Sequence, residues 1–337
     1  MESQKTVLMV RVDKIGDLVL SLPTDQVPLL KGMKIHWLIA KGTGFVAAHS
    51  DPPRAFHEID KEPSEESFQS LVEWVKNLKP DISIVLFAPS WVSRALAKAK
   101  VPLRIGRRSQ LKSWFHFNRG IRQSRKHGER HETDYNFEIV QRGLKGPWPT
   151  LFSEEAMAPL KLKAPALDLV KWGLVNNSYF IVHPGMAGSA LNWPSTHYDQ
   201  LLRVLVASHP VVITGTAADQ SHLVELAQKW KDHSGVHWLV DQLNSDELLG
   251  VLGGARAVIA PSTGILHLAA SLGCPCVGLY SPIPVQRPKR WGPRGPRAVA
   301  LMSPADPILA EKDPSSAMGK IKVVDVLAEL RMLEVLE

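Results

Sequence analysis

Residues 256–273 read Arg-Ala-Val-Ile-Ala-Pro-Ser-Thr-Gly-Ile-Leu-His-Leu-Ala-Ala-Ser-Leu-Gly. Ala257–Ala260 is a short apolar run typical of a buried strand, and Pro261 cannot extend its hydrogen-bond ladder. Ser262 or Thr263 can then cap a helix that runs almost to the end of the stretch. The sequence therefore predicts a strand that passes through a small-residue turn directly into a helix, which is the building unit of α/β proteins.

The turn between this strand and this helix is a candidate phosphate site. The first N–H groups of a helix lack partners within the helix, and the helix dipole favours an anion beside them. His267 lies one turn into the predicted helix, where its ring can reach back to the same anion. We therefore predict phosphate contacts from Ser262, Thr263, Gly264 and His267. The alternative is an ordinary strand-to-helix connection with a capped helix.

Length and composition favour two α/β domains. The chain has 337 residues, of which 45% are hydrophobic, enough for two cores. No apolar stretch approaches the ~20 residues of a membrane-spanning helix, and Val7–Val10 is too short for a signal peptide. Cys274 and Cys276 match neither a disulfide framework nor a zinc or redox motif. We therefore expect core cysteines and a cytoplasmic protein.

The net charge of +7 is concentrated in one segment. Between Arg94 and Arg130 there are twelve lysines and arginines against one acid, Glu129, and four aromatic rings are interleaved with them: Trp114, Phe115, His116 and Phe117. Such a segment can bind phosphate or carboxylate groups, or lie on an anionic membrane leaflet. The alternatives are a solvated basic loop and a nucleic-acid surface. No DNA- or RNA-binding motif is visible, so we do not expect nucleic acid.

Strands alternate with helices in both halves of the chain, which predicts doubly wound parallel sheets. We expect one domain over 1–160, a second over 161–316, and a C-terminal segment, 317–337, whose helix packs on either domain. The predicted strands are 7–12, 34–40, 82–87, 179–183, 211–214, 236–240, 257–260 and 276–280. The predicted helices are 17–30, 68–78, 198–208, 221–231, 246–253, 262–272 and 317–333.

Ligands of open parallel sheets bind outside the carboxyl ends of the strands, so we expect a cleft between two Rossmann-like domains that face each other. After the first strand the chain carries Gly16 and Asp17, but not the glycine pattern of a dinucleotide site. Asp17 is a candidate general base that takes a proton from a substrate hydroxyl. The alternative is that it caps its helix.

Two loops of the second half complete the candidate nucleotide site. Gly185, Gly188 and Ser189 follow the strand 179–183, and their N–H groups can cradle an anion. Thr214 and Gly215 begin a second small-residue turn before a helix. Together with the turn at 262–264, these loops predict that the second half binds a nucleotide diphosphate.

Three ordered motifs give the chain a family resemblance. They are Arg-x-Asp-x-Ile-Gly-Asp-x-Val-Leu-Ser-x-Pro from Arg11, His-Pro-Gly…Gly-Ser-Ala-x-Asn-Trp-Pro from His183, and Ser-Thr-Gly-x-x-His-Leu-Ala-Ala-x-Leu-Gly-x-Pro from Ser262. Over about residues 7–295 the chain resembles the heptosyltransferases, glycosyltransferase family 9. The resemblance implies a GT-B fold, with an acceptor-binding N-terminal half and a sugar-nucleotide-binding C-terminal half. It also implies inverting, metal-independent transfer of heptose from ADP-heptose to the lipopolysaccharide core.

The resemblance also implies roles for individual residues. Asp17 matches the family's general base, and Thr263, Gly264 and His267 match its diphosphate-binding turn and helix. No Asp-x-Asp metal motif appears, and no cofactor beyond the donor is expected. The family's acceptors are anionic and lipid-linked, so Lys14, Arg104, Arg107 and Arg108 become candidate acceptor contacts, and the inner-membrane surface a candidate partner.

Two positions depart from the family pattern. The family commonly has Asp where this chain has Ser262, and Lys or Arg where it has Leu191. Lys14 or a cation within 287–290 could replace the missing phosphate contact, or the donor differs. Two rival functions remain open: a non-catalytic GT-B relative that binds a nucleotide or glycan, and an anion- or nucleic-acid-binding protein that uses the segment 94–131.

Overall fold

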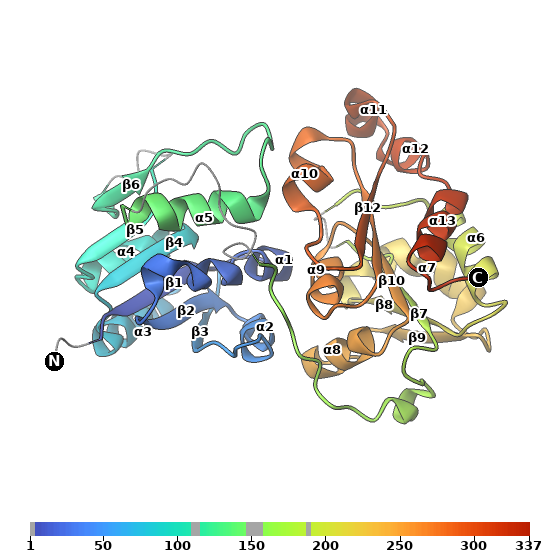
Figure 1. Cartoon of the computed structure of the whole chain (residues 1–337), viewed down its shortest axis with the longest axis horizontal. Coiled ribbons are helices and arrows are strands. Elements are labelled where there is room, and N and C mark those ends of the chain that lie inside the picture. Colours follow the sequence, from blue (N-terminus) through green and yellow to red (C-terminus); the bar gives the residue numbers. More distant parts are fainter. Residues whose placement is uncertain (1–3, 109–114, 146–157, 187–189) are drawn as a thin grey trace. The chain divides into compact units, whose positions relative to one another are not determined.

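A computed structural model describes residues 4–108, 115–145, 158–186 and 190–337 (Figure 1). The chain divides into two compact units, which we call the first unit, Met1–Lys126 with Arg130–Leu160, and the second unit, His127–Glu129 with Lys161–Glu337. Each unit contains one six-stranded parallel sheet with helices around it. The predicted α/β class with two Rossmann-like halves is therefore confirmed.

The sheet of the first unit has the strand order β3-β2-β1-β4-β5-β6, which is the Rossmann order. The run Val7–Val10 in the central strand β1 is fully buried, as expected where both faces of a parallel sheet are covered. The strands are β1 (Thr6–Arg11), β2 (Lys34–Ala40), β3 (Phe56–Ile59), β4 (Ile82–Phe87), β5 (Leu103–Arg107) and β6 (Arg119–Ile121).

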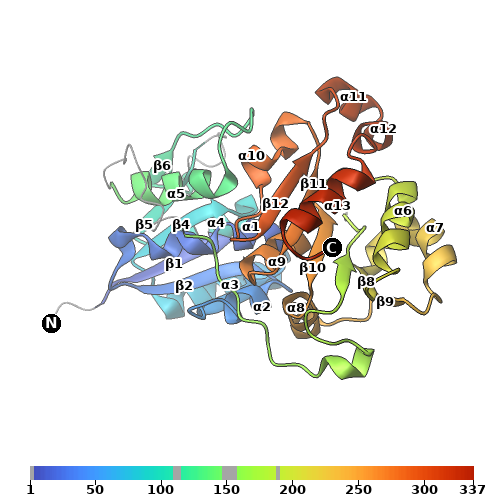
Figure 2. The same ribbon diagram turned by 45° about the vertical axis from the view of Figure 1, so that its right-hand side comes forward.

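Helices lie on both faces of this sheet (Figure 2). Two adjacent residues of β5 illustrate this arrangement, because successive side chains of a strand point to opposite faces of the sheet. Ile105 lies against Gly143 of α5, whereas Gly106 lies against Phe117 in the cluster that α3 and α4 form with the sheet. The helices are α1 (Ile15–Val19), α2 (Gly44–Ala48), α3 (Glu65–Leu78), α4 (Ser90–Lys98) and α5 (Glu132–Gly143).

The helix predicted over 17–30 is wrong. α1 ends at Val19, and two 3₁₀ turns follow, Leu22–Gln26 and Pro28–Leu30. Pro23 and Pro28 lack the N–H that a continuous helix would need, and their rings clash with the preceding turn. α1 is therefore a single short turn that carries Asp17 beside the end of β1.

The sheet of the second unit repeats the order of the first. Its order is β12-β11-β10-β7-β8-β9, which becomes the Rossmann order when its strands are counted from β7. β10 includes Pro261, one residue beyond the predicted end, opposite Leu279. The strands are β7 (Phe180–Val182), β8 (Val211–Gly215), β9 (Val236–Val240), β10 (Ala257–Pro261), β11 (Cys276–Tyr280) and β12 (Ala298–Met302).

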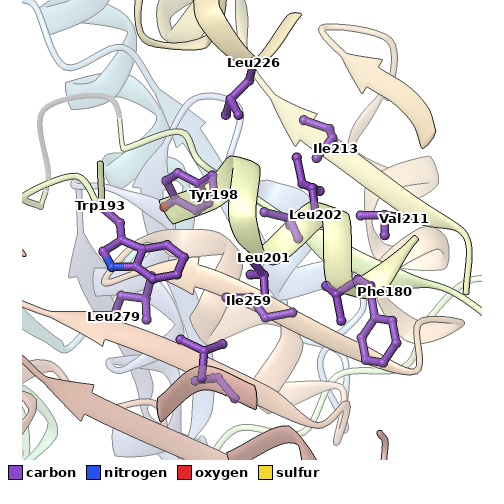
Figure 3. Close-up of a cluster of buried hydrophobic side chains, with 14 of the residues drawn as sticks. Phe180, Trp193, Tyr198, Leu201, Leu202, Val211, Ile213, Leu226, Ile259 and Leu279 are labelled. Carbon is purple, nitrogen blue, oxygen red and sulfur yellow. The ribbon is translucent and has the colours of Figure 1, made fainter. Parts of the chain in front are cut away.

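A large apolar cluster fills one face of the second sheet (Figure 3). Phe180, Val211 and Ile259 of the strands belong to this cluster together with Leu201 and Leu202 of α6. Helices α6 (Ser195–Leu205), α7 (Gln220–Trp230) and α13 (Val323–Met332) supply the other wall. The remaining helices are α8 (Ser245–Gly253), α9 (Gly264–Ser271), α10 (Pro288–Trp291), α11 (Pro307–Lys312) and α12 (Pro314–Met318).

The C-terminal segment packs on the second unit. Leu327 and Leu330 of α13 belong to its core cluster, and Trp193 Nε1 donates to the carbonyl oxygen of Ile321 at 2.9 Å. The single helix predicted over 317–333 is wrong, because a turn at Gly319–Lys322 separates α12 from α13. The Trp-Pro motif that begins at Trp193 therefore ties the end of the chain to the second sheet.

The two cysteines are buried and free, as predicted for core residues. Burial raises the pKa of the Cys274 thiol to about 12, so this thiol stays protonated. In the described part of the chain, no helix has the length and apolar character needed to cross a membrane.

Candidate active site

Asp17 lies in the first turn of the short helix that follows β1. α1 begins at Ile15, and Lys14 occupies the N-cap position. Asp17 is therefore the third residue of the helix, and its carboxylate binds Arg11 rather than a helix N–H. The alternative interpretation of Asp17 as a helix cap is wrong, and a charged group stands at the carboxyl end of the central strand.

Arg11, the last residue of β1, organises the charges around Asp17. Its guanidinium is buried, with 2% of the side chain exposed. Nη2 donates to Asp17 Oδ1 and, at 3.3 Å, to Asp13 Oδ2. Nη1 donates to Glu132 Oε1 at 3.4 Å, and Arg125 binds the same oxygen. We refer to these five residues as the Asp17 cluster.

The environment of Asp17 favours proton uptake at its carboxyl. Burial raises the pKa of this carboxyl above its ordinary value; Arg11 lowers it, and Asp13 and Glu132 raise it again, so the net direction is upward. The side chain is still 15% exposed, so a substrate can reach it. A carboxylate with a raised pKa is a stronger base than an ordinary aspartate, which suits general-base chemistry.

The turn after β10 leaves helix N–H groups without a side-chain cap. Thr263 takes the N-cap position of α9, but its side chain forms no capping hydrogen bond. Its hydroxyl is buried and has no hydrogen-bond partner among the described residues. His267 follows in the first turn of α9 with 3% of its surface exposed. The predicted residues are thus adjacent, and the capping interpretation for Thr263 is not supported.

Asp219 connects the other two loops at the strand ends of the second unit. Its Oδ1 accepts a hydrogen bond from the N–H of Met186 at 3.0 Å, in the loop after β7. Its Oδ2 accepts from the N–H of Thr216 at 3.0 Å, in the turn after β8. A Cβ on Gly185 would lie 2.5 Å from this carboxylate, so glycine permits the close approach. Gly188 and Ser189 lie outside the described residues.

An uncharged histidine, His183, directly follows β7 at the start of the first of these loops. His183 Nδ1 and Thr214 Oγ1 are 2.9 Å apart, and both side chains are buried. Burial lowers the pKa of His183 to about 4, against the opposing charge of Asp219. The imidazole is therefore uncharged near neutral pH and positions Thr214 at the end of β8, beside Gly215.

Two arginines of the basic segment are held by hydrogen bonds to backbone carbonyl oxygens. Arg104 Nε donates to the His116 carbonyl oxygen at 2.8 Å, and Arg108 donates to that of Phe117. Arg104 is the second residue of β5, whereas Arg107 ends that strand. At ~3.3 Å per residue, Arg104 lies about 10 Å from the carboxyl edge.

The acceptor-binding role predicted for Arg104, Arg107 and Arg108 stays a prediction, and this geometry favours Arg107 and Arg108 over Arg104. Lys14 is exposed beside the Asp17 cluster, and its predicted role is equally open. Of the four interleaved aromatic residues, Phe117 is part of the core, Phe115 is exposed, and Trp114 lies outside the described residues.

The two departures from the family pattern have different surroundings. Leu191 packs against the core of the second unit, so its side chain occupies an apolar environment. Ser262 is half-buried at the turn before Thr263. Among the cations proposed as substitutes, Arg287 Nε donates to the Pro282 carbonyl oxygen at 2.6 Å, and Lys289 pairs with Glu129 at 2.9 Å.

Two residues that matter here were not singled out from the sequence. Asp219 closes a capping box with Thr216, and that spacing is a signal that could have found it. Glu132 lies 121 residues from Arg11 in the chain, so no local pattern connects them. Among the described residues, no group of three His, Cys, Asp or Glu side chains could hold a metal ion.

Comparison with known proteins gives the family. The model of glycosyltransferase family 9 (heptosyltransferase) matches residues 71–322. Lipopolysaccharide heptosyltransferase 1 of Pseudomonas aeruginosa is 24% identical over 309 residues, covering 82% of this chain and 78% of that protein. Lipopolysaccharide heptosyltransferase 2 of Escherichia coli is 29% identical over 98 residues, which is 28% of each chain.

Solved structures show the same fold. The family 9 glycosyltransferase of Veillonella parvula has a TM-score of 0.79 at 18% identity, covering 99% of this chain and 98% of that one. Escherichia coli heptosyltransferase WaaC with ADP has a TM-score of 0.71 at 17% identity, covering 97% and 99%. The chain therefore has the GT-B fold of these heptosyltransferases.

Proposed function

The chain belongs to glycosyltransferase family 9, and we propose that it transfers heptose from ADP-heptose to an anionic, lipid-linked saccharide of the lipopolysaccharide core. The observation that carries the proposal is Asp17, a reachable carboxylate with a raised pKa that Arg11 holds at the end of β1. Structures of the relative WaaC with ADP and with ADP-2-deoxy-2-fluoro heptose support this donor.

The proposed reaction is a single displacement that inverts the anomeric carbon. Asp17 accepts the proton of the acceptor hydroxyl as that oxygen attacks the anomeric carbon. The bond from this carbon to the diphosphate oxygen breaks, and its electron pair leaves with ADP. The products are the glycoside, ADP and a protonated Asp17, which then releases its proton to solvent.

The second unit supplies the groups proposed to stabilise the leaving diphosphate. The uncapped N–H groups of α9, the Thr263 hydroxyl and His267 lie in one turn, and preorganised donors of this kind favour developing negative charge. Asp219 holds the loop after β7 beside the turn after β8, and we propose that the diphosphate lies against these two segments. We propose that this set serves without a bound metal ion or cofactor.

The first unit is proposed to bind the acceptor. Arg107 ends β5 on the carboxyl side of the sheet, Arg108 follows it, and Lys14 is exposed beside Asp17. Their charges suit the phosphate groups of a core saccharide. A lipid-linked acceptor places the reaction at the cytoplasmic face of the inner membrane, where we propose that the protein lies peripherally.

A panel of nucleotides tests the donor. Thermal unfolding is measured with ADP, GDP, UDP and CMP in EDTA. A ligand at a hundred times its Kd adds about 2.7 kcal/mol of stability, a shift of several degrees for a domain of this size. Selective stabilisation by ADP is expected, and selectivity for another base would change the donor but keep the fold and mechanism.

The rival candidate is a non-catalytic relative that binds a nucleotide or glycan. The apolar surroundings of Leu191, where the family carries a cation, favour it. Release of ADP from ADP-heptose with deacylated lipopolysaccharide core as acceptor decides between them. Nucleotide binding without acceptor-dependent ADP release would support the rival.

A further inference from the structure

Glu132 is a fully buried carboxylate that no step of the proposed reaction uses. It is the first residue of α5, and none of its surface is exposed. A buried charge is unfavourable unless it is paired and hydrogen-bonded. Its partners include two guanidinium groups, those of Arg11 at 3.4 Å and Arg125.

The contacts form a chain of alternating charges that ends at Asp17. Arg11 contacts Glu132 through Nη1 and Asp17 through Nη2, so one planar guanidinium joins the two carboxylates. Asn136 accepts a hydrogen bond from Arg11 at 3.4 Å and donates one to Ser21 at 3.0 Å. Helix α5 thereby holds the guanidinium through Nη1, while Asp17 binds Nη2.

The balance of charges in the Asp17 cluster changes when a proton arrives. Three carboxylates, Asp13, Asp17 and Glu132, surround two guanidiniums, Arg11 and Arg125, which leaves one net negative charge. Uptake of one proton by Asp17 makes the cluster neutral. An arginine beside an aspartate would otherwise keep it ionised and make it a weak base.

We propose that Arg11 and Glu132 are positioning residues for the proton transfer. Arg11 holds Oδ1 of Asp17, which leaves Oδ2 for the acceptor hydroxyl, and Glu132 holds Arg11 and offsets its charge. This inference rests on the proposed function, because it assigns to these residues a role in proton uptake by the base.

The test is the pH dependence of kcat/KM, measured with ADP-heptose and deacylated lipopolysaccharide core in EDTA. The charged groups that face Asp17 among the described residues are Arg11 on β1, Asp13 in the following loop and Glu132 on α5. Glu132→Gln removes a negative charge, so Asp17 should lose its proton more easily. We expect the acidic limb of the profile to move to lower pH by on the order of one unit.

Two further variants keep the test informative if Glu132→Gln does not fold. Asp13→Asn removes a carboxylate that is 23% exposed and contacts the same guanidinium, so it should also shift the limb to lower pH. Arg11→Lys keeps the positive charge but loses the planar contact with two carboxylates. It should lower kcat by roughly tenfold or more while ADP affinity stays unchanged.

Glu138→Gln is the matched control. Glu138 lies on the same helix and pairs with Arg130 and Arg142; Gln123 stands between it and Arg125 of the Asp17 cluster. The same substitution there should leave the acidic limb in place. A merely structural role for Glu132 would lower the melting temperature without moving the limb.

The outcomes distinguish failure of this inference from failure of the proposed function on which it rests. Loss of transfer in Asp17→Asn together with unshifted limbs in Glu132→Gln and Asp13→Asn would overturn the inference and leave the proposed base intact. Full transfer by Asp17→Asn would refute the base itself. Shifted limbs, with the control unshifted, would support both.

Discussion

The two units share one topology but carry different chemistry at their strand ends. Both sheets have the Rossmann strand order. The first strand of the first unit ends in Arg11, which leads into a cluster of five charged groups. The first strand of the second unit leads to His183, which is uncharged near neutral pH, and to a glycine-containing loop.

The two units show that one scaffold can carry different chemistry at its strand ends. A parallel sheet fixes where its strands end but not which side chains follow them, so function depends on those side chains. A charged cluster with a raised aspartate pKa suits movement of a proton. Uncapped helix N–H groups and closely approaching loops suit the binding of a diphosphate, which carries its charge before the reaction begins.

Replacing Asp17 should lower the rate of transfer more than any other substitution discussed below, and should leave the second unit unchanged. Asp17→Asn keeps the shape of the side chain but removes the proton acceptor. General-base catalysis contributes about 10²–10⁴-fold, so the rate of transfer should fall by that factor. The measurement is ADP release at saturating ADP-heptose; a rate within threefold of wild type would show that another group takes the proton.

The next effect concerns the neutral histidine of the second unit. The folded pKa of His183 is about 4, below its ordinary value of 6.5. The unfolded chain therefore binds a proton between these values that the folded chain excludes, and acid favours unfolding. The stabilisation is complete above about pH 6.5 and is lost as the pH falls toward 4.

This loss amounts to roughly 3 kcal/mol at 1.36 kcal/mol per pKa unit. The measurement is the free energy of unfolding from pH 7 to 4, in wild type and His183→Gln. The substitution should flatten the dependence over this range. An equally steep decline in both proteins would show that other groups control acid unfolding.

A smaller effect tests whether Asp219 holds the two loops. Asp219→Asn places an amide NH₂ where a carboxylate oxygen accepts from Thr216 or Met186. A lost buried hydrogen bond of this kind costs about 1–3 kcal/mol, so ADP should bind about tenfold more weakly or worse. Calorimetric titration with ADP measures it. Asp232→Asn, an exposed acid of the same unit, is the control that should bind like wild type.

Substitutions in the basic segment should have a weaker effect, on the binding of the acceptor. Arg107→Gln and Arg108→Gln should each raise the KM for the acceptor severalfold, since a single exposed charge contact contributes up to about 1 kcal/mol. Arg104→Gln should raise it less, because Arg104 lies away from the strand end. Changes in the KM for ADP-heptose instead would place these residues at the donor.

Local patterns predicted eight of the strands in the described chain, but not β3, β5, β6 or β12, nor helix α5, which carries Glu132. The apolar runs at 34–40 and 82–87 gave strands with the observed bounds, and Ala257 correctly begins β10. The helices at 17–30 and 317–333 failed because apolar periodicity continued across Pro23 and Pro28, and across the turn after α12. Apolar periodicity favoured a continuous helix in both segments, but the backbone hydrogen bonds of a continuous helix could not form there.

The sequence predicted some residues of the candidate site but not the charged groups that surround Asp17. Asp17, Thr263 and His267 stand in local motifs, so residue types and spacing were enough to select them. The cluster around Asp17 depends on Glu132, which the fold brings to Arg11 from 121 residues away. Its charge balance follows from tertiary packing, which no single motif contains.

The most direct test of assigning proton transfer to the first unit and ADP binding to the second measures ADP affinity and transfer rate in one variant of each unit. Asp17→Asn and Asp219→Asn are each assayed for ADP affinity by titration and for transfer rate at saturating ADP-heptose. We predict that Asp17→Asn binds ADP like wild type but transfers heptose at least a hundredfold more slowly, and that Asp219→Asn binds ADP weakly but approaches the wild-type rate at saturation. Weak ADP binding by Asp17→Asn together with normal transfer at saturation would contradict the assignment of the chemistry to the first unit.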